Sequence, residues 1–281
     1  MGGDGERFGD LATRIGELWS DRTALDPTDP RARAAVDEAI GLLDRGEARV
    51  AEVDDAGDVV VHEWVKQAIL LLFGQREVET IELGPFEYAD RIPLKSGYAA
   101  AGVRVVPGGS ARWGSFLDRG VVLMPSYVNI GARVGAGSMV DTWVTVGSCA
   151  QIGADVHLSG GVGIGGVLEP PQAAPVMVGD QAFIGSRSMI VDGARVGDGA
   201  VVGAGVILSS TVPVIDAETG GELGRGVVAP WCVAVSATLP RPCPGGECGL
   251  PCGLVIKRLE PGLRHDKSQL NEALRAHGST L

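Results

Sequence analysis

The fold of this chain is decided between residues 122 and 213, a stretch that opens with VLMPSYVNIGARVGAGSMVDTWVTVGSCAQIGADVHLSGGVGI (residues 122–164). A branched aliphatic residue recurs there at every sixth position: Val122, Val128, Val134, Val140, Val146, Ile152, Leu158 and Ile164. The same spacing returns later at Val178, Ile184, Ile190, Val196, Val202 and Leu208. Neither a helix nor a simple alternating strand produces a strict period of six. Hexapeptide repeats are typical of a parallel β-helix, in which each unit is one short strand and a corner.

Each six-residue unit is expected to point two side chains into a narrow core. Four residues after the aliphatic position stands a small or aliphatic residue, as at Ala132, Ser138 and Val144. Glycine often follows the aliphatic residue directly, where it relieves crowding as the backbone turns. Three units make a triangular coil, so residues eighteen apart stack at a strand spacing of about 4.8 Å. The eight units before the interruption and the six after it predict between four and five coils.

One interruption divides the repeat. Ile164 and Val178 are fourteen residues apart instead of six, and the intervening EPPQAAPVM (169–177) contains three prolines. Proline clusters between periodic segments mark loops. We therefore predict a loop extruded from the coil near residues 169–177.

The N-terminal region, residues 1–100, is predicted to be a mostly helical domain. Apolar residues at helical spacing favour amphipathic or buried helices near residues 8–20, 31–45 and 62–73. Between the last two, residues 48–53 and 59–62 flank the turn DDAGD and favour a β-hairpin. Residues 74–95 show little pattern and are interpreted as a connector.

The β-helix itself is predicted over residues 101–235, followed by a small C-terminal extension over 236–281. Within the extension, LVIKRL (254–259) favours a strand, and residues 265–277 favour a helix. The predicted fold class is therefore mainly β: a hexapeptide-repeat β-helix with a helical N-terminal domain and a strand and helix extension.

Composition narrows the functional classes. The 281-residue chain carries a formal net charge of −11, which argues against nucleic acid as a partner because such partners need a basic footprint. Local positive groups would still suffice for small anionic ligands. The sequence contains no run of about 18 apolar residues and no recognisable signal peptide. We therefore expect a cytoplasmic protein that does not engage a membrane.

Three of the five cysteines cluster near the C-terminus. Cys243, Cys248 and Cys252 lie in RPCPGGECGLPCG with the spacing C-x4-C-x3-C. A structural zinc site usually needs four ligands at tighter spacing, and no histidine lies nearby. We interpret this segment as a loop of reduced thiols and predict no metal; a structural metal site is the weaker alternative.

Two polar residues of the repeat are unsuited to its apolar core and are therefore candidates for a functional role. Asp141 stands at a position where glycine is common, so it is either a functional carboxylate or a corner cap. His157 is the only histidine of the repeat and is either a general base or a surface or interface residue. The nearby HLSGGVGIGGVLEP is dense in glycine, which lets a ligand or a neighbouring chain approach the backbone closely. Four basic residues are candidates for anion binding, with ordinary salt bridges as the alternative: Arg104, Arg187, Lys257 and Arg258.

Several sequence segments resemble those of a known family more closely than the period of six alone would require. It runs through AVDEAIGLLDRGEARVAE, HEWVKQAILLLF, RIPLK, GVRVVP, the stretch from MPSYVNIG to GVLEP, FIGSRSMIVDG and IKRL. Together these resemble the tetrahydrodipicolinate N-succinyltransferases of lysine and diaminopimelate biosynthesis, over almost the whole chain. The resemblance implies a left-handed β-helix, a homotrimer with active sites between subunits, and succinyl-CoA as a co-substrate with no permanently bound cofactor. The implied acceptor is the amine of ring-opened tetrahydrodipicolinate, and the implied products are N-succinyl-2-amino-6-oxopimelate and CoA.

The resemblance also assigns roles to individual residues. Arg104 of GVRVVP would hold a substrate carboxylate, for which arginine has the natural geometry. Asp141 of MVDTW would act in acid–base chemistry and bind substrate. Five residues would line the path of coenzyme A: Gly163, Gly166, Gly185, Arg187 and Lys257.

One departure from the family pattern bears on activity. The chain reads SRSMIVDG where the family reads ARSEVVEG, so Met189 stands where a glutamate is implied in proton transfer. A thioether is not a base, and loss of a general base typically lowers a rate about 10²- to 10⁴-fold. Asp192 corresponds to the family's second acidic residue and is not an obvious substitute.

Three alternatives therefore stand beside succinyl transfer. The chain could be a paralogue that acylates a different amine in specialised metabolism, or a non-catalytic homologue that binds CoA. A hexapeptide-repeat carbonic anhydrase would need three histidine ligands, and the repeat contains only His157.

Overall fold

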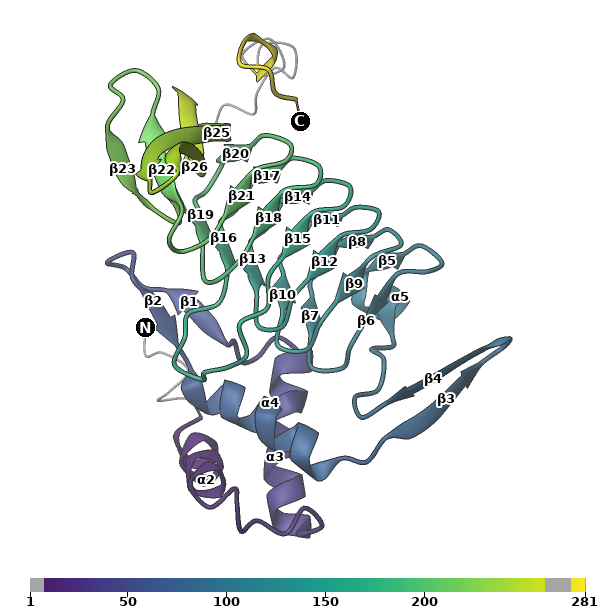
Figure 1. The fold of residues 1–281 in the computed structure, drawn as a ribbon. Coiled ribbons are helices and arrows are strands. Elements are labelled where there is room, and N and C mark those ends of the chain that lie inside the picture. The colour runs from purple at the N-terminus through teal and green to yellow at the C-terminus, as the bar shows by residue number, and fades with distance from the viewer. Residues whose placement is uncertain (1–7, 261–273, 281) are drawn as a thin grey trace.

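The structure is a computed structural model that describes residues 8–260 and 274–280. Its body is a left-handed parallel β-helix, with helices packed at one end and a long β-ribbon at the other (Figure 1). Successive short strands belong to successive sheets, so three sheets form the sides of a triangular coil. The fold class expected from the hexapeptide repeat is confirmed.

Each side of the coil is named here after its first strand. The β5 sheet contains β5 (Arg104–Val105), β8 (Val122–Leu123), β11 (Met139–Val140), β14 (His157–Leu158), β17 (Phe183–Ile184) and β20 (Val201–Val202). The β6 sheet contains β6 (Ser110–Ala111), β9 (Tyr127–Val128), β12 (Thr145–Val146), β15 (Gly163–Ile164), β18 (Met189–Ile190) and β21 (Ile207–Leu208). The β7 sheet contains β7 (Phe116–Leu117), β10 (Arg133–Val134), β13 (Gln151–Ile152), β16 (Met177–Val178), β19 (Arg195–Val196) and β24 (Val227–Val228).

The aliphatic residues of the repeat point inward as predicted, with one exception. From Val128 to Ile164, and from Val178 to Leu208, every sixth residue is at most 3% exposed. Val122 is the exception, because the parallel register places Leu123 opposite Val140 and leaves Val122 on the outer side. Leu123 and Val128 are five positions apart instead of six, so one corner is a residue shorter than the others. The inward series therefore begins with Leu123, and its prediction from Val122 was wrong.

Corner glycines allow neighbouring coils to approach, and Gly147 gives a direct test. A Cβ atom on Gly147 would lie 2.2 Å from the backbone nitrogen of Gly166. Because a backbone atom cannot swing aside, Gly147→Ala is expected to lower the free energy of unfolding by about 1–3 kcal/mol. Urea unfolding would measure the loss. Gly74→Ala is the control, since nothing lies within 4 Å of the added atom in that helix; equal stability of wild type and Gly147→Ala would contradict the steric account.

Residues 8–75 contain three helices and a hairpin. The helices are α2 (Gly9–Ser20), α3 (Pro30–Asp44) and α4 (Glu63–Gln75), and the antiparallel hairpin is β1 (Ala51–Val53) with β2 (Val59–Val61). At the start of α3, Asp29 accepts a hydrogen bond from the backbone nitrogen of Arg31 at 2.9 Å and Pro30 occupies the first turn. The hydrophobic core of the helices also contains Ile130 and Cys149 from the β-helix. The helices therefore pack directly against the coil.

A buried lysine joins this helical region to the extruded loop. Lys66 of α4 has no exposed surface, and its Nζ donates hydrogen bonds to the carbonyl oxygens of Pro170 (3.2 Å) and Ala173 (2.8 Å). Burial lowers the pKa of Lys66 because the charged form loses its hydration. The loop predicted near 169–177 lies between β15 and β16 and is held by an ammonium group rather than by apolar contacts alone.

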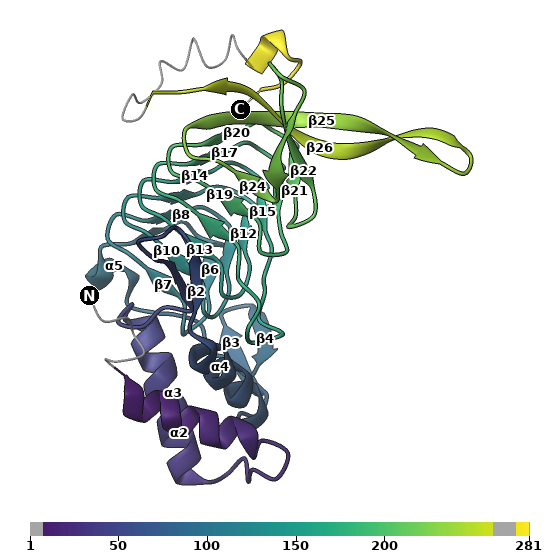
Figure 2. The same cartoon turned by 90° about the vertical axis from the view of Figure 1, so that its left-hand side faces the viewer.

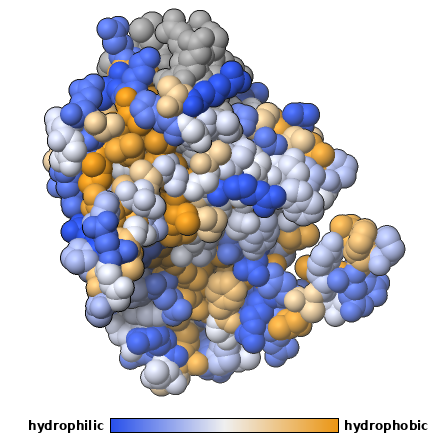
Figure 3. Space-filling view, turned by 45° about the horizontal axis from the view of Figure 1, so that its top comes forward, coloured by the Kyte–Doolittle hydropathy of each residue, from blue (hydrophilic) through white to orange (hydrophobic). Residues whose placement is uncertain are grey.

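Residues 74–95 are not the featureless connector that was predicted. They contain the antiparallel hairpin of β3 (Glu79–Leu83) and β4 (Phe86–Asp90), which extends away from the coil (Figure 1). In the space-filling view the hairpin stands apart from the body as a separate lobe (Figure 3). Its apolar residues pair across the strands, Ile81 with Tyr88 and Leu83 with Phe86. Because most of its side chains are exposed on both faces, the segment lacks the half-buried alternation that identifies a strand in sequence. A short helix, α5 (Tyr98–Ala101), follows it.

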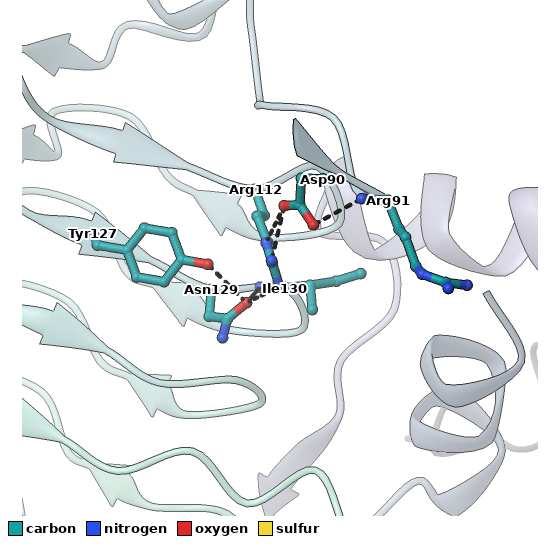
Figure 4. A network of polar contacts seen from close by, with 6 residues as sticks. All are labelled: Asp90, Arg91, Arg112, Tyr127, Asn129 and Ile130. Carbon is teal, nitrogen blue, oxygen red and sulfur yellow. Dashed lines mark hydrogen bonds and ion pairs between the residues drawn. The ribbon is translucent and has the colours of Figure 1, made fainter. Parts of the chain in front are cut away.

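A polar network fastens the base of the hairpin to the β6 sheet (Figure 4). Asp90 Oδ2 accepts hydrogen bonds from Arg112 Nε (3.1 Å) and Nη2 (2.8 Å). Arg112 Nη1 and the Tyr127 hydroxyl both donate to Asn129 Oδ1, each at 3.2 Å. Burial raises the pKa of Tyr127, so its hydroxyl remains a donor. The network positions the hairpin against the first coils.

At the C-terminal end, the cysteine-rich segment is a ribbon and not the predicted loop. After the hairpin of β22 (Pro213–Asp216) and β23 (Glu222–Arg225), β25 (Cys232–Cys243) pairs antiparallel with β26 (Gly246–Arg258). The ribbon projects from the coil (Figure 2). The segment was interpreted as a loop, yet only residues 244 and 245 form the turn. The strand predicted at 254–259 lies mostly within β26, whereas the helix predicted at 265–277 falls mainly outside the described residues; residues 274–276 are helical.

All five cysteines are free thiols. Within residues 8–260 and 274–280, no three His, Cys, Asp or Glu side chains form a group that could hold a metal ion. In the same residues, no helix has both the length and the apolar character needed to cross a membrane.

Candidate active site

The candidate residues gather at the corner where the β5 sheet turns into the β6 sheet. We call this the Asp141 corner; it comprises residues 141–143, 159–161 and 185–187 on three successive coils. One left-handed residue stands at each level: Trp143 (φ 63°), Gly161 (φ 71°) and Arg187 (φ 61°). The backbone nitrogen of Gly161 donates to Thr142 O at 2.8 Å, and that of Arg187 donates to Gly160 O at 3.1 Å. These hydrogen bonds stack the three levels in register.

Asp141 and His157 face each other at this corner. The Asp141 Oδ2 and His157 Nε2 atoms are 3.7 Å apart, and the two side chains are 33% and 40% exposed. The other carboxylate oxygen, Oδ1, accepts hydrogen bonds from the backbone nitrogen (2.7 Å) and hydroxyl (3.3 Å) of Thr142. The two interpretations of Asp141, corner cap and functional carboxylate, are therefore compatible, since each oxygen has a different partner.

The β-helix register explains why His157 meets Asp141. His157 stacks on Met139, eighteen residues earlier, and Phe183 stacks on His157 in turn. The ring centroids of His157 and Phe183 are 5.0 Å apart. Asp141 lies two residues beyond Met139, at the corner beside the imidazole. The eighteen-residue coil predicted from sequence already implies that His157 lies beside Asp141. It did not predict the contact with Phe183, because the extruded loop lengthens that coil.

Arg187 belongs to the same corner. A Cβ atom on Gly161 would lie 2.7 Å from Arg187 Cδ, so the arginine side chain lies across the coil below it. Glycine at position 161 therefore adopts the left-handed backbone without strain and leaves room for the Arg187 side chain. The guanidinium adds a positive group to a corner that carries the Asp141 carboxylate.

Met189 lies on the outer face of the β6 sheet and is 42% exposed. It pairs with Gly163, and a Cβ atom on that glycine would lie 2.4 Å from Met189 Sδ. The thioether therefore occupies the space that Gly163 leaves open. Asp141 lies in the corner that precedes β12. Met189 lies in β18, which is two strands from β12 in the same sheet, so it is about 10 Å further along the coil axis.

The other sequence candidates lie apart from the corner or have packing roles. Gly185 is at the corner, but its hydrogen faces the backbone nitrogen of Ala204, and Gly166 faces Ser148. Counted in strand steps of about 4.8 Å, Arg104 is about 14 Å and Lys257 about 19 Å from His157 along the β5 sheet. Both are exposed.

Arg258 is already engaged, because its Nη2 donates to Asp216 Oδ2 at 2.6 Å. The Asp216 carboxylate raises the pKa of Arg258 still further above its already high value. Of the four basic candidates, Arg187 alone stands at the Asp141 corner of this chain.

Two of the grooves in the described part of the chain lie beside the hairpins that precede the coil. One of about 470 Å³ separates the β1–β2 hairpin from the β7 sheet and is lined by residues that include Arg49 and Arg195. Another of about 750 Å³ lies between the β3–β4 hairpin and the β6 sheet and is lined by residues that include Phe86 and Tyr127. Neither contains a residue of the Asp141 corner, which in a single chain is an open surface.

Comparison with known proteins connects this geometry to a family. Residues 10–74 match the family "Tetrahydrodipicolinate N-succinyltransferase N-terminal", and residues 175–210 match "Hexapeptide repeat of succinyl-transferase". The chain is 46% identical over 279 residues to a 2,3,4,5-tetrahydropyridine-2,6-dicarboxylate N-succinyltransferase of Methylorubrum extorquens, covering 95% of this chain and 98% of that protein. A protein of the same name from Dechloromonas aromatica is 45% identical over 272 residues, covering 94% and 98% of the two chains.

A solved structure of similar fold supports the architecture. It is a putative 2,3,4,5-tetrahydropyridine-2-carboxylate N-succinyltransferase from Campylobacter jejuni, with a TM-score of 0.50 and 18% sequence identity. The superposition covers 79% of this chain and 62% of that one. At this identity the likeness supports the fold alone.

Proposed function

Because the chain belongs to the tetrahydrodipicolinate N-succinyltransferase family, we propose that it transfers the succinyl group of succinyl-CoA to the amine of ring-opened tetrahydrodipicolinate. The protein is an acyltransferase. The observation that carries the proposal is the identity of about 45% over nearly the full length of N-succinyltransferases. The products would be N-succinyl-2-amino-6-oxopimelate and CoA, within lysine and diaminopimelate biosynthesis.

Acyl transfer needs a group that accepts a proton and cations that bind the substrates, and the Asp141 corner contains side chains of both kinds. The amine nitrogen attacks the thioester carbonyl carbon, a C–N bond forms, the C–S bond breaks, and one proton must leave the nitrogen. Asp141 and His157 are the acid–base pair placed at this corner. Both substrates are anionic, so cationic side chains are needed close by, and Arg187 is the one that stands there.

We further propose that a second copy of the chain completes the site, in a homotrimer. Arg104 and Lys257, which the family resemblance assigns to substrate and CoA, are many ångströms from Asp141 within one chain. The open surface at the corner and the positions of these two cations are accounted for if a neighbouring subunit supplies them. The cytoplasmic location stays a prediction.

A second candidate function rests on Met189. Its exposed thioether covers Gly163, at the position where the family has a glutamate. An enzyme with the same fold and CoA site could therefore acylate a different, less polar amine. A homologue that binds CoA without turnover is the remaining alternative.

Product analysis separates these possibilities. The wild-type protein is incubated with succinyl-CoA, with and without tetrahydrodipicolinate, and the N-succinyl product and free CoA are quantified by mass spectrometry. We expect acceptor-dependent formation of both in equal amounts. Turnover by Met189→Glu but not by wild type would favour a different native acceptor, and CoA binding without turnover by either protein would favour the non-catalytic homologue.

A further inference from the structure

We propose that Cys243 and Cys248, at the tip of the β25–β26 ribbon, form a reversible disulfide when the protein meets a peroxide. Both cysteines are free thiols in the structure. They lie where the ribbon projects from the coil (Figure 2), and their chemistry is independent of the proposed acyl transfer. The pairing of the two strands is what brings them together.

The antiparallel register puts the two cysteines on one face of the ribbon. Cys243 stands opposite Gly246, and Cys248 stands opposite Arg241. Residues directly opposite each other share a face, and so do residues two positions apart along a strand. Cys243 and Cys248 are therefore diagonal neighbours on the same face, and the chain between them contains the turn at residues 244 and 245.

The two side chains also interact. Hydrogen bonding with the side chain of Cys248 raises the pKa of the Cys243 thiol. The Cys243 sulfur lies 3.7 Å from the carbonyl oxygen of Arg241, the residue opposite Cys248. Exposure agrees with this placement, because Cys243 is half-buried even at the tip of the ribbon, whereas Cys248 is exposed. The Cys243 thiol therefore faces its neighbour across the ribbon.

Closing the bond needs a small movement, and the ribbon tip has room for it. Diagonal neighbours have Cα atoms about 7–8 Å apart, whereas a disulfide usually spans about 4.4–6.8 Å. Residues 244–251 are all exposed, and a Cβ atom on Gly245 or Gly246 would meet no described atom within 4 Å. Because the tip is held by cross-strand pairing and not by packing, the two strands can draw together by the ~1 Å required.

The other three cysteines are placed differently. Cys149 is buried between the helices and the coil, and Cys232 is buried at the base of the ribbon. Cys252 is 5% exposed. It is four residues from Cys248 on the same strand, a separation of about 14 Å at about 3.4 Å per residue. Of the five cysteines, Cys243 and Cys248 are thus the two that lie close together where an oxidant can reach them.

The proposed reaction balances with one molecule of hydrogen peroxide. The Cys248 thiolate attacks a peroxide oxygen and the O–O bond breaks, which leaves a sulfenic acid on Cys248 and releases one water. The sulfur of Cys243 then attacks the sulfenic sulfur, the S–O bond breaks, and the proton of Cys243 leaves with the hydroxide as a second water. Two electrons pass from the two thiols to the peroxide.

The order of the two steps follows from exposure and hydrogen bonding. Cys248 is exposed, whereas the raised pKa of Cys243 keeps that thiol protonated at neutral pH, and the thiolate is the nucleophile. Cys248 is therefore oxidised first and Cys243 resolves the sulfenic acid. An exposed disulfide is open to attack by a thiol reductant, which reverses the reaction.

Proteolysis at Glu247 gives a direct test, because this residue lies between the two cysteines in the chain. The reduced full-length protein is treated with hydrogen peroxide, its remaining thiols are alkylated, and the denatured protein is cut after glutamate. We expect mass spectrometry to find the fragments on either side of Glu247 still joined, lighter by two hydrogen atoms, and separated after reduction.

Single variants assign the bond. Cys243→Ser and Cys248→Ser are each expected to lose the joined fragments completely. Cys252→Ala is the matched control, because it removes the next cysteine of the same strand and is expected to keep them joined. In Cys243→Ser the sulfenic acid on Cys248 has no partner, so we expect dimedone to trap it there. Thermal melts confirm that each variant is folded.

Three outcomes would overturn the proposal. Joined fragments that persist in Cys248→Ser, or that separate in Cys252→Ala, would assign the bond to other cysteines. Thiols that stay free, or that carry only sulfinic or sulfonic acid, would exclude a disulfide at this tip. Disulfide-linked dimers on a non-reducing gel, in place of the internal bond, would make the cysteines intermolecular contacts. Succinyl transfer is assayed separately on the reduced protein, so none of these results decides it.

Discussion

Asp141→Asn is expected to lower kcat about 10²- to 10⁴-fold while leaving the protein folded. Asparagine retains an oxygen that can accept the 2.7 Å hydrogen bond from the Thr142 backbone nitrogen, so the corner cap survives. What it loses is the negative charge 3.7 Å from His157 Nε2, and with it the carboxylate that can accept a proton. The effect should therefore appear in catalysis and not in stability.

Steady-state kinetics with both substrates and a thermal melt would measure the two quantities separately. Asp180→Asn is the matched control, because Asp180 Oδ1 caps the backbone nitrogen of Ala154 at 2.8 Å on a corner away from the site. We expect Asp180→Asn to keep the wild-type kcat. If both variants retained full activity, Asp141 would be a structural cap only.

The wild-type protein is expected to lose about 3 kcal/mol of stability through Cys149 alone when the pH rises from about 8 to about 11. Burial raises the pKa of this thiol from 9.0 to about 12. Below pH 9 the thiol is neutral in the folded and unfolded chains, and the stabilisation is complete. Above pH 9 the unfolded thiol ionises while the folded one does not, so stability falls until about pH 12.

Lys66 changes the pH dependence of stability in the opposite direction. Burial lowers the pKa of its ammonium group, so below 10.5 the unfolded chain binds more protons and stability rises with pH. A variant is therefore needed to isolate the thiol. Cys149→Ala keeps a Cβ atom at the same left-handed position (φ 69°) and removes the ionisable group.

Urea unfolding at both pH values would give the free energies. The fall in stability with pH should be about 3 kcal/mol smaller in Cys149→Ala than in wild type. Identical pH dependence in Cys149→Ala and wild type would show that the thiol does not contribute.

The sequence predictions failed where side chains are exposed on both faces of a strand. The β3–β4 hairpin and the projecting part of the β25–β26 ribbon are held by cross-strand hydrogen bonds and pairs, and they bury little of their surface. The hydrophobic periodicity of a sequence reveals only strands that have one buried face. Ribbons that are exposed on both faces therefore look like connectors in sequence. The shift from Val122 to Leu123 has a different cause, since one shortened corner changes the inward residue without disturbing the units that follow.

By itself the sequence determined the β-helix, its core residues and the candidate corner residues, because a strict period of six can be buried in only one kind of coil. It also placed Asp141 and Met189 outside that core. The tertiary structure alone decided which side chains meet: Asp141 with His157, Phe183 with His157 across the extruded loop, and Lys66 with carbonyl oxygens more than 100 residues away. These contacts depend on the stacking of whole coils and on the packing of α4 against them. Contacts between residues so far apart in the chain produce no periodic pattern in the sequence.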